Sequence, residues 1–182
     1  TDIRYAMTEL VRHLTEKGHR RIAYFRPPEP PEAGYSANRW HGYLDALRQF
    51  GATVPTWCTA IQEISPATHR EVMARFAARL AAAVREEGVT AVMCPSDVYA
   101  WDLIMNLQHA GLSIPRDLAV TGFDDWTIPP DYHGPPPTTV RHAYKTIIQE
   151  SVSLLVRMIA GENIGINEIL VPPQIMYREA TA

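Results

Sequence analysis

Two adjacent carboxylates, Asp124 and Asp125, are the side chains with the clearest chemical potential in this chain. They follow the apolar run 118–121, which predicts a short buried strand. Ligands of open α/β sheets bind beside the carboxyl ends of the strands, so this position favours a ligand contact. A carboxylate accepts two hydrogen bonds, as the neighbouring hydroxyls of a sugar require. We expect this role for Asp124 and a loop or capping role for Asp125.

Arg39 and Trp126 are further candidates for contact with a small ligand. The Arg39 guanidinium carries several donors in a planar fork, which suits hydroxyl or carboxylate groups, and a surface salt bridge is the alternative. Trp126 directly follows the two carboxylates and is the indole we would test for stacking on a sugar ring. We predict that Arg39 and Asp124 converge on one hollow at the rim of the strands.

The elements that position these residues alternate between helix and strand. Apolar residues at helical spacing predict five helices, and a glycine follows each of them. Apolar runs predict strands at 21–25, 89–93 and 118–121, with a further short strand possible at 54–61. The fold class is therefore α/β, a doubly wound, mostly parallel sheet with helices on both faces. The predicted helix-ending glycines are Gly18, Gly51, Gly88, Gly111 and Gly161.

The second half of the chain contains less regular structure. Five prolines between 129 and 137 exclude a helix or an inner strand from that loop. A helix follows over about 143–160, and the tail 169–176 is extended and suits the edge of a sheet.

Composition indicates an ordinary globular protein. The chain has 182 residues, of which 46% are hydrophobic and 20% charged, and its net charge of −3 argues against a large nucleic-acid surface. Cys58 and Cys94 lack metal-type spacing and are expected as buried side chains in a reducing compartment. With neither a secretion signal nor a membrane-spanning run, we expect a cytoplasmic protein with no membrane contact, metal or cofactor. Motifs of hydrolases, zinc proteases and nucleotide-binding enzymes do not occur, so we expect no catalysis.

Six blocks, in order, resemble the LacI/GalR-type bacterial transcription regulators. The blocks are Asp2 to Phe25 with HLTEKGHRRIAYF at 13–25, RWHGY at 39–43 with Ala46, Leu47 and Gly51, AVMCPSDVYA at 91–100, IPRDLAVTGFDD at 114–125, PTTV at 137–140 followed by a helix that ends with IAG at 159–161, and VPPQIMYREAT at 171–181.

This resemblance implies a periplasmic-binding-protein-like fold of two lobes that hold a small effector between them. It also implies a homodimer and a helix-turn-helix that reads an operator. We expect that module, the hinge and the first half of the amino-terminal lobe to be absent from this chain, so operator DNA would be bound only through the missing module. The expected division is a remnant helix of the amino-terminal lobe at 1–18, the carboxyl-terminal lobe at 19–140, a second remnant helix at 141–162, and a return strand and tail at 163–182.

Both remnant helices carry an apolar stripe. Leaving such stripes in water costs roughly 25 cal/mol per Å². We therefore expect these helices to pack on each other, on the remaining lobe, or across a dimer.

The resemblance also assigns roles to single residues. Arg39 and Asp124 stand at effector-contacting positions, and Ser96 stands where the family commonly has asparagine, with ligand contact left open. Asp97 is expected to cap the helix that starts there by accepting a backbone N–H bond.

Three further positions follow from the same resemblance. His142 and Tyr144 lie at the crossover between the lobes, where an aromatic ring often closes the pocket, although core or interface packing is equally open for Tyr144. Ile64 is a loosely aligned candidate for another wall.

Together these observations predict the effector-sensing and dimerisation region of a LacI/GalR-type regulator. The expected effector is a sugar or sugar derivative, because Arg39 and Asp124 suit its hydroxyls. The alternatives are a solute-binding protein of a sugar uptake system, which shares the fold, and an α/β enzyme.

Overall fold

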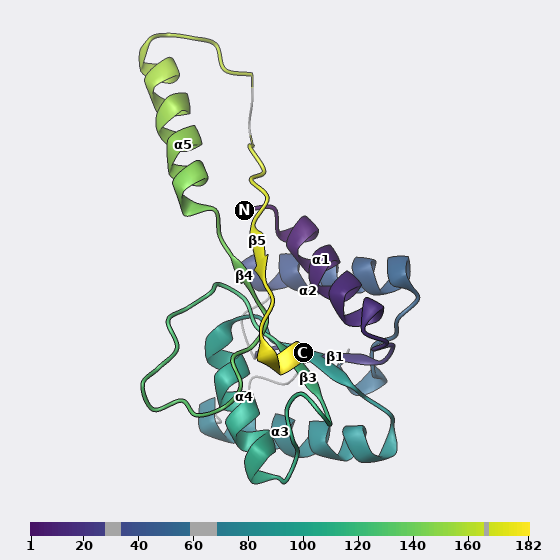
Figure 1. Cartoon of the computed structure of the whole chain (residues 1–182). Helices are drawn as coiled ribbons and strands as arrows, with labels where there is room; N and C mark the ends of the chain where they lie inside the picture. Colours follow the sequence, from purple (N-terminus) through teal and green to yellow (C-terminus); the bar gives the residue numbers. More distant parts are fainter. Residues whose placement is uncertain (28–33, 59–68, 166–167) are drawn as a thin grey trace.

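A three-stranded parallel sheet in the order β1-β2-β3 forms the centre of the protein. The computed structural model describes residues 1–27, 34–58, 69–165 and 168–182. Two helices cover one face of the sheet and two cover the other (Figure 1). The predicted parallel sheet with helices on both faces is confirmed. Its strands are β1 (Ile22–Tyr24), β2 (Ala91–Met93) and β3 (Ala119–Thr121), with α1 (Ile3–Glu16) and α2 (Gly34–Phe50) on one face and α3 (His69–Glu86) and α4 (Asp97–His109) on the other.

The strand residues alternate between two apolar cores. Ala23, Val92 and Val120 pack with α3 and α4, whereas the apolar residues beside them in each strand pack with α1 and α2. Successive side chains of a strand point to opposite faces, so a strand covered on both faces must be apolar throughout. This is why the three strands read as unbroken apolar runs.

Each of the five predicted glycines follows the end of a helix. Their φ angles lie between 64° and 94°, in the left-handed region that other L-residues rarely adopt. A residue in this conformation turns the chain out of the helix and satisfies its last carbonyl groups. The predicted helix ends are confirmed.

Two details of the sheet differ from the sequence prediction. Instead of a strand at 54–61, the described residues 54–58 hold a 3-10 turn, η1 (Thr56–Cys58), in which the Pro55 carbonyl accepts from the Cys58 amide at 2.9 Å. Pro55 lacks an N–H for a sheet ladder, and the one parallel bridge lies just before the predicted strand, at Thr53. Residues 59–61 lie outside the described chain. An unpredicted strand, β4 (Thr139–Arg141), pairs antiparallel with β5 (Gln174–Met176) in the extended tail.

Helix α1 packs on α2 and on the sheet. Its apolar stripe is fully covered, with Leu10, Val11 and Leu14 at most 1% exposed. The expectation that this helix packs on the remaining lobe is confirmed. It therefore shares one core with residues of the predicted carboxyl-terminal lobe, and the division into lobes stays a prediction.

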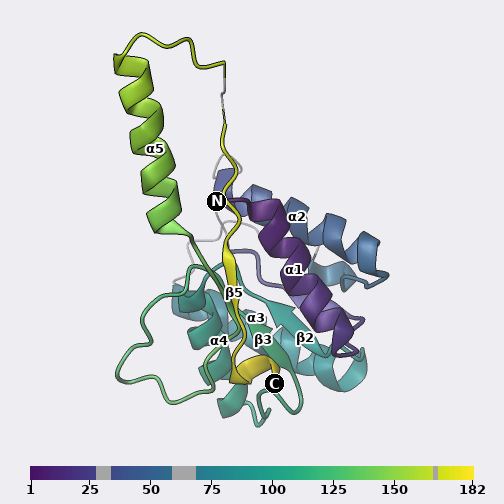
Figure 2. The ribbon, with the colours of Figure 1, turned by 45° about the horizontal axis from the view of Figure 1, so that its top comes forward.

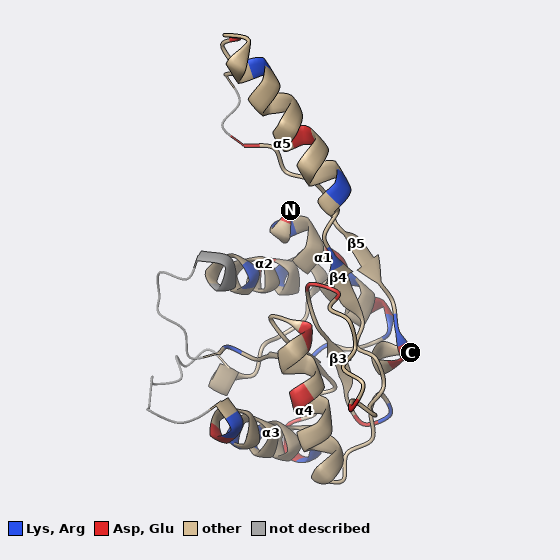
Figure 3. Ribbon diagram, turned by 90° about the vertical axis from the view of Figure 1, so that its left-hand side faces the viewer, with Lys and Arg blue, Asp and Glu red and all other residues tan. Residues whose placement is uncertain are grey.

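Helix α5 (Tyr144–Ile159) extends away from the rest of the protein (Figures 1 and 2). It has no buried residue, and its last residue, Ile159, is 77% exposed. Most of the α5 ribbon belongs to residues other than Lys, Arg, Asp and Glu (Figure 3). Within the described residues this stripe has no packing partner. The expectation that this helix packs on the other remnant helix or on the remaining lobe is therefore wrong, and packing across a dimer stays a prediction. The large apolar side chains exposed on α5 are Ile148, Val152, Leu155, Val156, Met158 and Ile159.

Cys58 and Cys94 are free and buried, as predicted. Burial raises the pKa of the Cys58 thiol to about 12 and also raises the pKa of the Cys94 thiol, so both are unreactive small side chains at neutral pH. Within the described ranges, no helix combines the length and apolar character needed to cross a bilayer. The same ranges hold no cluster of His, Cys, Asp and Glu suited to a metal ion.

Candidate functional site

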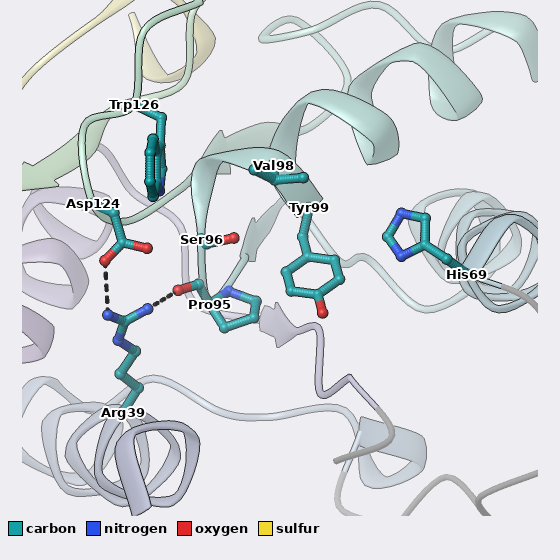
Figure 4. Close-up of a pocket in the computed structure, with 8 residues that line it drawn as sticks. All are labelled: Arg39, His69, Pro95, Ser96, Val98, Tyr99, Asp124 and Trp126. Atoms are coloured by element: carbon teal, nitrogen blue, oxygen red, sulfur yellow. Dashed lines mark hydrogen bonds and ion pairs between the residues drawn. The ribbon is translucent and has the colours of Figure 1, made fainter. Parts of the chain in front are cut away.

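The candidate site lies at the carboxyl ends of the three strands. The chain leaves β2 into Pro95 and Ser96 and leaves β3 into Asp124, while α2 brings Arg39 to the same edge (Figure 4). Backbone hydrogen bonds continue beyond the strands and keep these segments side by side. The Cys94 amide donates to the Thr121 carbonyl, and the Asp97 amide donates to the Phe123 carbonyl, each at 2.9 Å.

Arg39 is buried at the base of the site, with 6% of its surface exposed. One guanidinium nitrogen donates to Asp124 Oδ1 at 2.8 Å, and another donates to the Pro95 carbonyl. The guanidinium carbon lies 3.8 Å from the centre of the Phe123 ring, within the range of a cation–π interaction. The predicted convergence of Arg39 and Asp124 is therefore confirmed.

Asp124 is held in an unusual backbone conformation. Its φ is 94° and that of Asp125 is 53°, and aspartate is among the few non-glycine residues that tolerate this region. The Asp124 amide donates to the Val140 carbonyl at 3.0 Å, which fixes the turn against β4. Strained residues of this kind cluster at binding sites because the surrounding structure holds them in place.

A hollow of about 500 Å³ opens beside this ion pair. Its size falls within the range of small-molecule pockets. Four of the predicted site residues lie in its lining: Arg39, Asp124, Ser96 and Trp126. Trp126 stands above Asp124 in Figure 4 and is 59% exposed, so much of its indole is accessible to a ligand. The other lining residues are His69, Pro95, Val98 and Tyr99.

The two predicted residues from the crossover segment have different surroundings. His142 Nε2 lies 3.0 Å from Asp124 Oδ1, and its Nδ1 lies 2.6 Å from the Thr1 hydroxyl. It therefore contacts the site through Asp124 without lining the hollow. Tyr144 packs against His142 with ring centres 5.2 Å apart, is 60% exposed, and also lies outside the lining.

Asp125 connects the turn after β3 to neighbouring segments of the chain. Its carboxylate pairs with Arg141 and Arg178, and its amide donates to the Thr139 hydroxyl at 3.3 Å. These interactions tie the turn after β3 to β4 and to the segment after β5, as the expected loop role requires.

Asp97 does not cap α4 in the way we predicted. The helix begins at Asp97 with Ser96 as its N-cap residue, and the Asp97 carboxylate instead accepts from the Trp126 amide at 2.9 Å. Burial raises the pKa of Asp97 to about 6, against hydrogen bonds from Thr139 and Trp126 that favour the charged form. A Cβ at Gly122 would lie 2.1 Å from Asp97 Oδ1, so any side chain there requires the Asp97 carboxylate to move.

The sequence did not predict His69 and Tyr99 as lining residues. Tyr99 lies three residues, or about one helical turn, after Ser96, and this spacing places both on the same side of the start of α4. The spacing to Ser96 is therefore the pattern from which Tyr99 could have been predicted. His69 begins α3, and only the packing of α3 against α4 brings it to the hollow. The predicted wall residue Ile64 lies outside the described chain.

The chain is similar to a known domain family and to bacterial regulators. A model of the periplasmic binding protein-like domain matches residues 11–181. An HTH-type transcriptional regulator from the aml 5′ region of Streptomyces limosus is 32% identical over 100% of this chain and 49% of its own length. The HTH-type transcriptional repressor CytR of Escherichia coli K12 is 28% identical over 97% of this chain and 49% of its own. The chain therefore spans about half the length of the curated relatives it matches.

Solved structures show the same likeness. A LacI-family regulatory protein from Chloroflexus aggregans superposes with a TM-score of 0.82 at 27% identity, over 98% of this chain and 61% of that one. A complex of the transcriptional regulator CelR with cellobiose superposes with a TM-score of 0.76 at 26% identity, over 99% of this chain and 52% of that one.

Proposed function

Because the chain belongs to the periplasmic binding protein-like domain family, in the form found in LacI-type regulators, we propose that it is the effector-sensing region of such a regulator. The convergence of Arg39 and Asp124 on a hollow at the carboxyl ends of the strands carries this proposal. Open α/β sheets bind their ligands at this edge.

The proposed effector is a sugar or sugar derivative. Asp124 accepts hydrogen bonds from neighbouring hydroxyls, Arg39 donates to ring or hydroxyl oxygens, and Ser96 both donates and accepts. The exposed indole of Trp126 stacks on the apolar face of the sugar ring. The relative CelR was solved with cellobiose, which supports the same ligand class here.

Binding of this effector controls operator DNA through a helix-turn-helix outside the residues of this chain. The effector must contact two states of the full-length dimer differently, because only differential affinity shifts a conformational equilibrium. DNA binding needs clustered Lys and Arg, so the net charge of −3 supports a sensing role for this chain and DNA binding by the separate helix-turn-helix. We place the full-length regulator in the cytoplasm as a homodimer, and the apolar face of α5 packs within that assembly.

Two other functions share the fold or the residue types. A solute-binding protein of a sugar uptake system would use the same hollow, but the relatives named above are transcription regulators. An α/β enzyme would need a nucleophile or acid–base pair in the hollow, and the relatives named above are not enzymes. The regulator is the function we propose, with no catalytic activity.

Thermal unfolding with a ligand panel tests the proposal. A sugar at 100 times its Kd stabilises a protein by about 2.7 kcal/mol, which raises Tm by roughly 5–10 °C in a domain of this size. Asp124→Asn removes the shift, whereas the control Asp131→Asn, at an exposed position outside the hollow, retains it. A shift caused by a purine or an amino acid and by none of the sugars contradicts the proposal.

A further inference from the structure

The hollow beside β2 and β3 has two chemically different ends. Arg39 and Asp124 form one end, with Trp126 above them (Figure 4). His69 and Tyr99 form the other, and Pro95 lies between the two ends in the same view. A ligand with one ring at the ion pair therefore leaves the His69–Tyr99 end available for a second group.

The His69–Tyr99 end is built from two rings held in position. His69 Nε2 lies 2.6 Å from Asp102 Oδ2, and the His69 and Tyr99 ring centres are 5.6 Å apart. Behind them, the Tyr99 ring packs against Phe25, with ring centres 5.1 Å apart. The His69–Asp102 pair is about half exposed, so it contributes little to stability, and its effect is to orient the imidazole.

The charge of the hollow favours an uncharged ligand. Arg39 is the one arginine or lysine in the described lining, and its guanidinium is engaged by the Asp124 carboxylate and the Pro95 carbonyl. A phosphate or carboxylate group of a ligand would have to compete with Asp124 for the same cation. Hydroxyl groups meet no such conflict, because they donate to the carboxylate and accept from the guanidinium.

We propose that the His69–Tyr99 end is a second subsite, which takes the second ring of an uncharged glycoside whose sugar ring binds at Arg39 and Asp124. This proposal rests on the sugar-sensing function above and adds the ligand class to it. The Tyr99 face packs against the second ring, and the His69 imidazole adds a polar edge for its hydrogen-bonding groups. His69 is the specificity-determining residue, and Asp102 is the residue that positions it.

Calorimetry with matched pairs of free sugar and glycoside tests this subsite. The probes are glucose with cellobiose and maltose, galactose with lactose, and ribose with cytidine and adenosine. We expect one glycoside to bind at least about tenfold more tightly than its own free sugar, the amount that an added ring contact provides. Selection of an O-linked sugar or of a nucleoside identifies the second ring, and either selection supports the proposal.

Variants locate the gain in affinity. His69→Ala and Tyr99→Leu are expected to lower the affinity for the selected glycoside about tenfold and to change the affinity for the free sugar less than twofold. Asp102→Asn is expected to produce part of the His69→Ala loss. The control His109→Ala, at an exposed position in the last turn of α4, leaves both affinities unchanged.

Four outcomes overturn the inference. Equal affinity for free sugar and glycoside removes the second subsite, and so do variants that weaken both ligands equally. Glucose 6-phosphate is measured beside glucose, and tighter binding of the phosphate than of its parent sugar contradicts the charge argument. Binding of none of these probes by the unmodified protein overturns the sugar-sensing function itself, and this result differs from the first two, in which free sugars still bind.

Discussion

The ion pair between Arg39 and Asp124 is expected to couple strongly in the folded protein. Their side chains are only 7% and 19% exposed, and the joined atoms are 2.8 Å apart. Two unit charges about 4 Å apart attract by about 4 kcal/mol at the effective dielectric constant of about 20 found near protein surfaces. We therefore predict a coupling free energy of about 2–4 kcal/mol, well above the value of 0–1 kcal/mol typical of exposed pairs.

A double-mutant cycle measures this coupling through urea unfolding. Arg39→Met retains much of the side-chain volume, and Asp124→Asn retains a residue that tolerates positive φ. Asp124→Asn alone is expected to cost about 3 kcal/mol or more, because it leaves a buried cation without its counter-charge. The double variant is expected to lose less than the sum of the two single losses.

The matched control is an exposed ion pair on α2, the helix that carries Arg39. Arg48 and Asp45 also join at 2.9 Å, but their side chains are 74% and 47% exposed. Arg48→Met with Asp45→Asn is expected to give a coupling of about 0.5 kcal/mol or less. If the Arg39–Asp124 cycle gives the same small value, the buried pair described here does not exist in solution.

Three further predictions test the surroundings of the site. Burial raises the pKa of Asp97 from 3.8 to about 6, so the folded protein holds this proton more tightly than the unfolded chain does. The unfolding free energy is therefore expected to fall by up to about 3 kcal/mol as the pH rises from below 4 through 6. Urea unfolding of Asp97→Asn is expected to lack this fall, and parallel pH profiles of the two proteins would exclude it. Gly122→Ala places a Cβ 2.1 Å from a carboxylate oxygen and is expected to lower the unfolding free energy by about 1–3 kcal/mol in thermal unfolding. The control Gly165→Ala places its Cβ where no atom lies within 4 Å and is expected to cost less than about 0.5 kcal/mol. Leu155→Lys with Ile159→Lys on α5 is expected to weaken self-association in sedimentation. Measured at a concentration where the protein is monomeric, the same change is expected to alter the unfolding free energy by less than about 0.5 kcal/mol, and a loss above about 2 kcal/mol there would show that α5 packs within the chain.

Local patterns in the sequence predicted the layers and the charged end of the site. The three sheet strands have apolar residues on both faces, and each helix ends before a glycine with positive φ, so neither feature depends on distant contacts. Asp124 was predicted from its place after a strand, because the carboxyl ends of parallel strands share one edge.

Features that depend on distant residues could not be predicted in the same way. Thr139–Arg141 becomes a strand only by pairing with Gln174–Met176, far along the chain. His69 reaches the hollow through the packing of two helices, and the Asp97 carboxylate turns away from its own helix because the Trp126 amide lies within reach. For Tyr144 the sequence left ligand contact and packing equally open, and in the structure its ring packs on His142 and is largely exposed.

The most direct test of the account is a structure of the protein with a bound sugar. The account predicts that the sugar lies in the hollow, with its hydroxyls donating to the Asp124 carboxylate, an oxygen accepting from the Arg39 guanidinium, and a ring face against Trp126. A sugar bound elsewhere, with the Arg39–Asp124 pair intact and the hollow filled only by water, would contradict it.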